Sequence, residues 1–241
     1  MTEQHHKKEE EVSSTTIWLI AIAAVLILFN QIQLFQLGNI MGTPVFGTLS
    51  TSVKTFSRGD LGDVDINSIT STAQAIAATF ELEGKDAQGV IDTMIPKGTP
   101  PYGAELGISY DDPVTALNFL HRKLYPAIKQ DVQKNKPEVW KRYLNLATKP
   151  VGISCEYCCG VGPVSIDANG NSRCGCSHNP AIHALTLYLM ANTDMTDAEI
   201  LQEALRWKAL WFPKNMIQLG TQIAGGDASV LADVPSMVGG C

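Results

Sequence analysis

The sequence has no excess of basic residues and none of the common motifs of catalysis. It contains 18 Lys and Arg against 24 Asp and Glu, and its formal net charge is −6. This balance gives no reason to expect a nucleic acid as partner. We recognise no glycine-rich phosphate loop, no GxGxxG, no HExxH and no Ser-His-Asp constellation in the chain. We therefore expect a binding protein rather than an enzyme, with no nucleic-acid partner.

Charge is missing altogether from one stretch near the N-terminus. No charged residue occurs from Val12 to Val53, and the run IWLIAIAAVLILF (Ile17–Phe29) is unbroken apolar sequence. A helix of roughly 20 residues spans a bilayer core. The pattern predicts a transmembrane helix over residues 16–38 after a polar tail over residues 1–15.

Two other interpretations of this apolar run are a cleaved signal peptide and a buried core helix. A signal peptide needs a cationic leader and a small-residue cleavage site. The leader TEQHHKKEEE is not cationic on balance, and no such site follows the run. Lys7 and Lys8 lie close to the span, whereas Lys54 and Arg58 lie farther beyond it, which favours an extracytoplasmic body. The sequence thus predicts a single-pass membrane protein that contacts the lipid bilayer.

The body of the chain is predicted to be mainly α-helical. A linker over residues 39–65, rich in Gly, Ser and Thr, precedes a helical region over residues 66–149. Apolar residues recur at helical spacing in its first segment, at Ile69, Ala73, Ile76 and Phe80. The predicted helices of this region are 66–82, 85–95, 111–133 with a kink at Pro126, and 136–147, with a loop over 97–110.

Two more helices are predicted after a cysteine-rich segment. Asn179 and Pro180 are typical first residues of a helix that runs to Asn192. Thr196 and Glu199 form a capping-box pattern before an apolar run that ends at Pro213. We therefore assign residues 150–213 to a cysteine-rich knuckle plus two helices, and residues 214–241 to a flexible C-terminal tail.

Cysteine is scarce, yet five of the six cysteines lie within 22 residues. They occur in CEYCCG (Cys155–Gly160) and in CGCSHN (Cys174–Asn179). Between the two groups, Asn169-Gly170 is a strong signal for a two-residue hairpin turn. A β-hairpin there would bring the two cysteine groups side by side, as in small metal-binding knuckles.

Two histidines follow the second cysteine group and complete a set of metal-binding residue types. Thiolate and imidazole are the ligands that Zn²⁺ prefers, in tetrahedral sites of four. The set exceeds four, so some members are spectators or the site holds several ions. Copper(I) and a 2Fe-2S cluster are the alternatives to zinc. The predicted ligands are Cys155, Cys158, Cys159, Cys174, Cys176, His178 and His183.

Disulfides and a thiol redox centre are the rival interpretations of the cysteines. Exported domains often pair their cysteines, and Cys241 makes the number even. Disulfides leave the two histidines unexplained, however. A thioredoxin-like centre would need a helix after Cys158, where the sequence has Cys-Gly-Val-Gly-Pro. Glu156, inside the motif, is interpreted as an exposed loop charge rather than a general base.

These expectations combine into one functional hypothesis with two alternatives. The first is a membrane-anchored protein whose cysteine-rich knuckle holds a structural zinc and which binds a protein partner or forms a homo-oligomer. The second is an extracytoplasmic copper-handling protein. The third is an electron carrier with a 2Fe-2S cluster ligated by Cys155, Cys158, Cys174 and Cys176.

Overall fold

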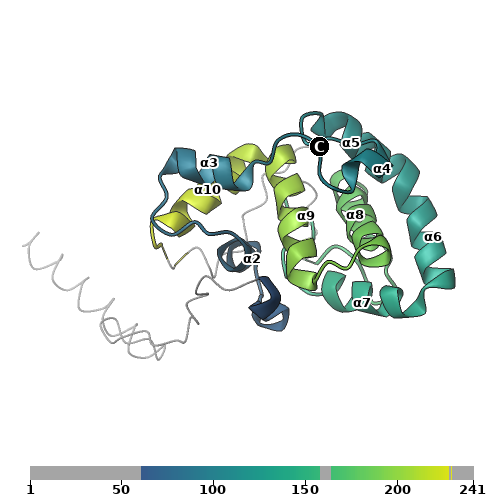
Figure 1. Ribbon diagram of the computed structural model, residues 1–241. Coiled ribbons are helices and arrows are strands. Elements are labelled where there is room, and N and C mark those ends of the chain that lie inside the picture. Colours follow the sequence, from purple (N-terminus) through teal and green to yellow (C-terminus); the bar gives the residue numbers. More distant parts are fainter. Residues whose placement is uncertain (1–60, 158–163, 228, 230–241) are drawn as a thin grey trace, which may run out of the picture. The chain divides into compact units, whose positions relative to one another are not determined.

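The computed structural model describes residues 61–157, 164–227 and 229, and these residues form a mainly helical body (Figure 1). They contain no β-strand, and all of them belong to one compact unit. The elements, in chain order, are η1 (Leu61–Asp63), η2 (Ile66–Ser68), α2 (Thr72–Thr79), α3 (Ala87–Met94), α4 (Gly103–Leu106), α5 (Pro113–Phe119), the π-helix η3 (Leu120–Leu124), α6 (Tyr125–Asn135), α7 (Pro137–Ala147), α8 (His178–Asn192), α9 (Asp197–Trp211) and α10 (Pro213–Ala224).

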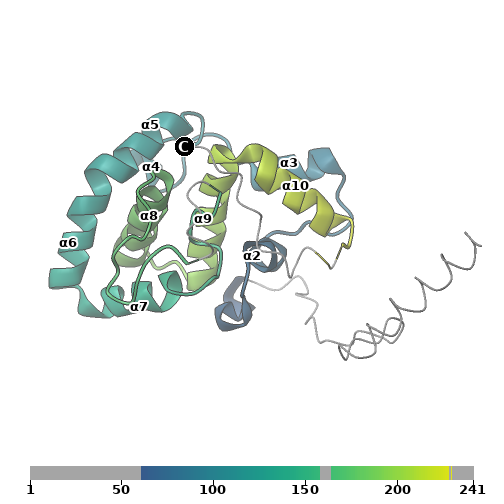
Figure 2. The same ribbon diagram turned by 180° about the vertical axis from the view of Figure 1, so that it is seen from behind.

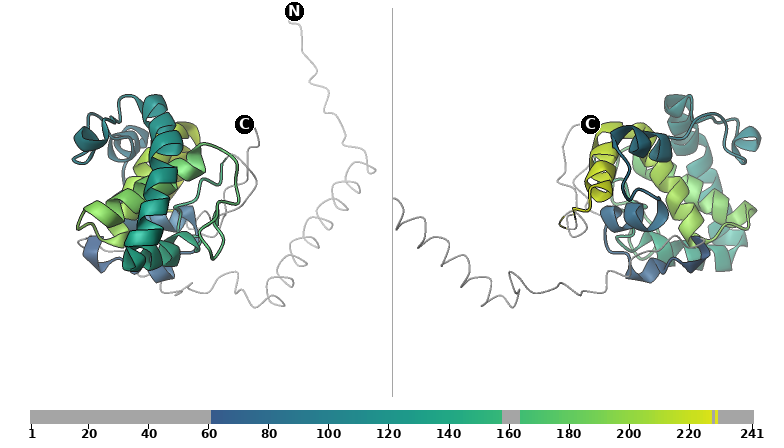
Figure 3. Two further views of the ribbon diagram at one scale, coloured as in Figure 1. Left: turned by 90° about the vertical axis from the view of Figure 1, so that its right-hand side faces the viewer. Right: turned by 60° about the vertical axis from the view of Figure 1, so that its left-hand side comes forward.

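Helix α8 is the central element of this body. Every residue from Asn179 to Met190 is buried. A helix that is apolar on all sides needs neighbours on all sides, and α8 packs against α6, α7, α9 and the π-helix. Figure 3, left, shows α6 lying across one side of it. The position of α8 matters for function because its first turn carries one of the candidate metal ligands.

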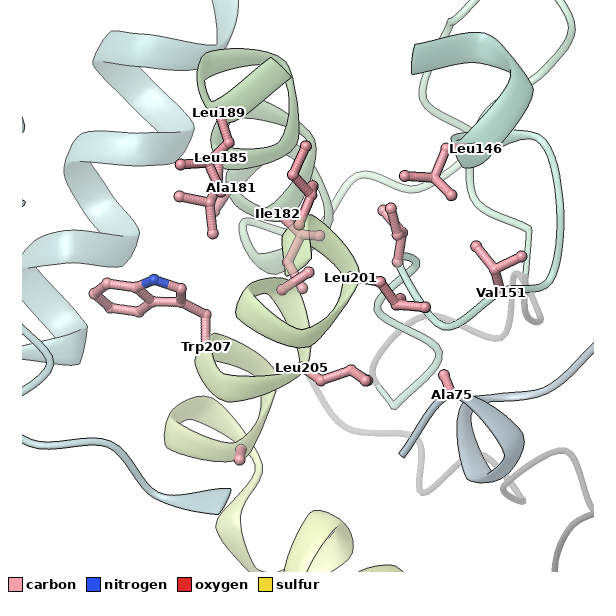
Figure 4. Packing of buried hydrophobic residues seen from close by; sticks show 14 of the residues in the cluster. Ala75, Leu146, Val151, Ala181, Ile182, Leu185, Leu189, Leu201, Leu205 and Trp207 are labelled. Carbon is pink, nitrogen blue, oxygen red and sulfur yellow. The ribbon is translucent and has the colours of Figure 1, made fainter. Parts of the chain in front are cut away.

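Helix α9 packs beside α8 and links it to α2 and α10. The predicted capping box is confirmed: Thr196 N–H donates to Glu199 Oε2 at 2.6 Å, and Glu199 N–H donates to Thr196 Oγ1 at 3.3 Å. In Figure 4, Leu205 of α9 projects toward Ala75 of α2, and Trp207 projects from another side of α9. Helix α9 therefore contributes core side chains in two directions.

The predicted kink at Pro126 takes the form of a π-helical turn. Tyr125 N–H donates to the Leu120 carbonyl, five residues back, and α6 then starts with Pro126 in its first turn. Proline has no N–H to donate and its ring crowds the preceding turn, so the wider turn accommodates it. The predicted start of α5 is confirmed as well, since Asp112 Oδ1 accepts from Thr115 N–H at 3.1 Å and Pro113 is the first helical residue.

Between α7 and α8, the described residues 148–157 and 164–177 contain no helix or strand, and they carry Cys155, Cys174 and Cys176; parts of this segment come forward in Figure 2. Its part around Asn169-Gly170 is not the predicted β-hairpin. Among the described residues there is a single antiparallel bridge, between Ile166 and Ser172, and no strand. Side-chain bonds replace a longer ladder: Ser172 Oγ donates to the Cys174 carbonyl at 2.8 Å and accepts from Cys174 N–H at 3.3 Å.

The prediction of a membrane span is corrected too. Across residues 61–157, 164–227 and 229, no helix combines the length and apolar character needed to cross a membrane. The predicted transmembrane helix over residues 16–38 and the tail over residues 1–15 lie outside the described residues. The structure therefore gives no support for the single-pass membrane protein with an extracytoplasmic body that the sequence predicts.

A further difference concerns the C-terminal end of the body. The segment assigned to a flexible tail begins with α10, which buries Met216, Gly220 and Ala224. Gly220 permits close packing there, because a Cβ at this position would lie 2.5 Å from Met94 Sδ and 2.9 Å from Val90 Cγ1. The helical spacing of Met216, Leu219 and Ile223 is present in the sequence, and the interpretation as a tail overlooked it.

Substitution of Gly170 tests how the irregular segment is held against α7. Gly170 has φ +76°, and a Cβ there would lie 2.5 Å from the Trp140 ring. We expect Gly170→Ala to lower the free energy of unfolding of the metal-free protein by about 1–3 kcal/mol. Gly175→Ala is the matched control, because a Cβ at Gly175 meets nothing within 4 Å. Chemical denaturation showing equal stability of both variants would contradict this packing.

Candidate metal centre

Three side chains from two parts of the chain converge on one point. Cys155 comes from the loop after α7, while Cys176 and His178 lie at the start of α8. One ligand atom of each residue lies within 4.8 Å of the other two. Around a tetrahedral zinc, with Zn–S near 2.3 Å and Zn–N near 2.0 Å, neighbouring ligand atoms are about 3.3–3.8 Å apart. The three donors are therefore close enough to share one ion after a small contraction.

Cys174 supplies a third sulfur beside this group. Its Sγ lies 3.2 Å from Cys176 Sγ, well beyond the S–S bond length of about 2.05 Å. Cys155, Cys174 and Cys176 form one buried cluster, against which Phe212 packs. Cys155 and Cys176 are free thiols. Cys174 thus adds a third sulfur beside Cys176, next to the three donors that converge at the start of α8.

Each of the three sulfurs accepts a hydrogen bond from a backbone amide. Tyr157 N–H donates to Cys155, Cys176 N–H donates to Cys174 Sγ at 3.4 Å, and Asn179 N–H donates to Cys176. Amide donors stabilise the ionised form of the acceptor. Such bonds also fix the orientation of metal ligands. The backbone therefore prepares all three sulfurs to act as thiolates.

Asn179 holds the parts of the site together. The sequence predicts it as the N-cap of α8 with Pro180 as the first helical residue, but the helix starts two residues earlier, at His178, and Asn179 is fully buried inside its first turn. Its Oδ1 accepts from Cys155 N–H at 3.1 Å, and its Nδ2 donates to the Ser165 carbonyl at 3.5 Å. The prediction was wrong because tertiary contacts take up the side chain that would otherwise cap the helix.

The thiols of Cys155 and Cys176 interact, and their pKa values are shifted in opposite directions. The hydrogen bond from the Cys155 thiol is the largest cause that lowers the pKa of Cys176, and His178 and the Asn179 amide lower it further. The same bond, together with burial, raises the pKa of Cys155 far above its ordinary value. The pair gives up one proton readily and resists loss of the second. A bound cation supplies the charge that allows the second thiol to ionise.

His178 lies between the cysteines and two aromatic rings of α9 and its C-terminal cap. Its ring centroid is 5.7 Å from that of Trp211 and 4.7 Å from that of Phe212. Its Nδ1 is buried and has no hydrogen-bond partner within the described part of the chain. Stacking fixes the ring plane, so the imidazole is held beside the sulfur of Cys176.

The other predicted ligands fall in different places. His183 lies further along α8, fully buried, and its Nε2 is 2.8 Å from Ser165 Oγ rather than in the sulfur group. Its ring packs edge-on against Tyr143, with the two centroids 5.7 Å apart. Cys158 and Cys159 lie outside the described residues, so their place in the ligand set stays a prediction.

A buried ion pair that was not predicted from the sequence lies beside Cys155. Glu156 is expected from the sequence to be an exposed charge, but neither its side chain nor that of Lys208 is exposed at all, and Lys208 Nζ lies 3.5 Å from Glu156 Oε2. One signal was available, since Lys208 follows Leu201 and Leu205 at the spacing of a core-facing helix stripe. The expectation for Glu156 was therefore wrong.

The ion pair fixes the loop that carries Cys155. Lys208 of α9 contacts this loop on both sides of Cys155. Its Nζ donates to the Gly152 carbonyl at 2.9 Å and to Glu156, and it lies 5.4 Å from the centroid of the Tyr157 ring. Glu156 also accepts hydrogen bonds from the hydroxyl groups of Thr72 and Ser154. The pKa of Cys155 is raised mainly by the hydrogen bond to Cys176 and by burial. The positive charge of Lys208 lowers it by a smaller amount. The loop is thus held by a charge in the core as well as by apolar packing.

Removing one member of the ion pair should destabilise the protein strongly. Lys208→Met leaves the Glu156 carboxylate buried without a cation, which typically lowers the free energy of unfolding by about 3–5 kcal/mol. The double variant Lys208→Met, Glu156→Gln has no buried charge, and we expect it to recover most of that loss. Chemical denaturation of the metal-free proteins measures both. Equal losses in the single and the double variant would show that the charges do not interact.

His183 should make the protein sensitive to mild acid. Burial, followed by the nearby charge of Lys129, lowers the pKa of His183 from 6.5 to about 3. Between pH 6.5 and about 3, His183 is protonated in the unfolded chain but neutral in the folded protein. The stability contributed by a neutral His183 is therefore complete above pH 6.5 and is lost progressively as the pH falls toward 3. In this range we expect the free energy of unfolding to fall by roughly 1.4 kcal/mol for each pH unit of acidification.

The matched variant for this prediction is His183→Gln, which can keep a hydrogen bond to Ser165 but does not titrate. Denaturation between about pH 5 and 6.5, with a chelator present, should show a smaller slope of stability against pH in this variant. Identical slopes in the two proteins would contradict a neutral, buried His183.

The chemistry that the site offers is that of soft and borderline metal ions. It presents three sulfurs with amide donors, one imidazole, and a buried cation next to the loop that carries Cys155. A comparison of the chain with protein-family models, curated proteins and solved structures finds no match. The arrangement of these side chains is therefore the basis on which a function is proposed.

Proposed function

We propose that the protein binds a zinc ion through Cys155, Cys176 and His178, with the sulfur of Cys174 as the fourth ligand. The observation that carries the proposal is the convergence of three donor atoms, from two separate segments of the chain, within 4.8 Å of one another. The amide hydrogen bonds to the sulfurs support it, because they favour thiolates. A set of three thiolates and one imidazole is a common structural zinc site.

The role proposed for the ion is structural. The segment that carries the cysteines has no strand among its described residues, and its shape depends on side-chain bonds and on a few backbone bonds around Gly170. A zinc ion would tie the Cys155 loop to the first turn of α8 and, through His178, to Trp211 and Phe212. Because such a site does not exist in the unfolded chain, its binding free energy adds to the stability of the folded state.

Zinc is favoured over the alternatives by the mixture of donors. Thiolate and thioether sulfurs select copper(I), whereas three thiolates together with one imidazole form a common structural zinc site. The 2Fe-2S cluster predicted from the sequence draws on Cys158, which lies outside the described residues, and leaves the imidazole of His178 unused. The sequence also predicts that the protein binds a protein partner or a second copy of the chain, and this stays a prediction.

Metal analysis of the full chain tests the proposal. We expect about one zinc per chain in protein purified without added metal, and a colourless solution. Replacement by Co²⁺ should give the intense sulfur-to-cobalt absorption and the visible bands of a tetrahedral site. Cys155→Ser, Cys176→Ser and His178→Asn should each weaken zinc binding by at least about tenfold. Cys241→Ser is the matched control, because Cys241 lies far from the motif in sequence.

The outcomes separate the candidate metals. Visible absorption from bound iron would replace zinc with a cluster, and one copper per chain would replace it with a soft-metal carrier. Cys158→Ser and Cys159→Ser extend the test to the cysteines outside the described residues: loss of metal in either would enlarge the ligand set. Reduced protein that binds no metal would refute the proposal.

A further inference from the structure

The two cysteines of the Cys-Gly-Cys sequence are close enough to react with each other. Cys174 Sγ and Cys176 Sγ are 3.2 Å apart, a non-bonded contact that a movement of about 1 Å converts into a disulfide. Both side chains stand in one short turn, held by the bonds of Ser172 to the Cys174 backbone. The two sulfurs are thus positioned as neighbours in the reduced protein.

These two cysteines are also more accessible than the third one of the cluster. Cys174 and Cys176 each keep 8% exposure, whereas Cys155 has none. Gly175 between them is exposed, and a Cβ built on it would meet no atom of the described residues within 4 Å. The turn therefore faces open space, where an external reagent can approach and where the backbone can adjust.

We propose that Cys174 and Cys176 are a thiol–disulfide couple that exchanges with disulfides in solution. One of the two sulfurs attacks the external disulfide, forms a mixed disulfide and releases one thiol. The second sulfur then attacks its neighbour, forms the Cys174–Cys176 bond and releases the other thiol. The protein loses two electrons and two protons, and the external disulfide gains both to become two thiols.

This couple would control the metal, an extension that depends on the proposed zinc site. A sulfur in a disulfide has no charge to offer a cation, so oxidation removes two of the four proposed ligands at once. The remaining pair, Cys155 and His178, cannot hold a tetrahedral zinc alone. In the metal-bound form the thiolates carry no protons, so the exchange takes two protons from water and sets Zn²⁺ free.

A peptide map tests the couple directly, because the sequence separates the cysteines conveniently. Trypsin cleaves after Arg173 and after Arg206, which places Cys174 and Cys176 in one peptide without any other cysteine. The full chain, reduced and freed of metal with a chelator, is incubated with an excess of oxidised glutathione, and its remaining thiols are then alkylated. We expect the 174–206 peptide to lose two hydrogens and to escape alkylation.

Variants and a zinc measurement complete the experiment. Cys155→Ser should still form the linked peptide, whereas Cys174→Ser should lose it. In zinc-loaded protein, a chromophoric chelator should show metal release at the same rate as the link appears. A link between Cys176 and the peptide that carries Cys155, or an unchanged 174–206 peptide, would overturn the proposal. Absence of zinc from the reduced protein would refute only the metal site, since the peptide map is read without metal.

Discussion

The ammonium group of Lys208 lies in the core with the Glu156 carboxylate 3.5 Å away, and neither side chain is exposed. Two charges removed from water are tolerated only where each finds its partner and further hydrogen bonds. Here a backbone carbonyl and the hydroxyls of Thr72 and Ser154 supply those bonds. The two buried charges keep all their hydrogen bonds only when α2, α9 and the loop between α7 and the cysteine cluster meet. This need for hydrogen bonds fixes the loop in one conformation. The position of Cys155 follows from this arrangement.

The burial of α8 creates the second half of the site. Because this helix is enclosed on all sides, its first turn cannot be solvated and must bond to neighbouring segments. Asn179 does so by accepting from Cys155 N–H and donating to the Ser165 carbonyl. The amide of the same residue donates to Cys176. A single buried side chain and its backbone therefore align the two chain segments whose sulfurs converge.

Much of the helical fold could be predicted because it depends on local rules. The proline and aspartate at the start of α5 and the capping box of α9 act within one turn of helix, so the sequence shows them directly. The β-hairpin at Asn169-Gly170 failed because its turn signal is local, whereas strands need a ladder of pairs. Here the bonds of Ser172 compete with such a ladder. The burial of Glu156 has no signal in its own segment, since its partner Lys208 is 52 residues away, and only the position of Lys208 on a core-facing helix stripe indicates a buried charge.

The sequence by itself determined the helical class, several helix ends, and the residue types that can hold a metal. These follow from periodicity, capping and ligand chemistry, which act over a few residues. Only the tertiary structure decided which of the predicted ligands meet. It placed Cys155, Cys176 and His178 together and turned His183 toward Ser165. The physical reason is that a shared site depends on distances between segments, and these are set by the packing around α8 and by the buried charge contributed from α9.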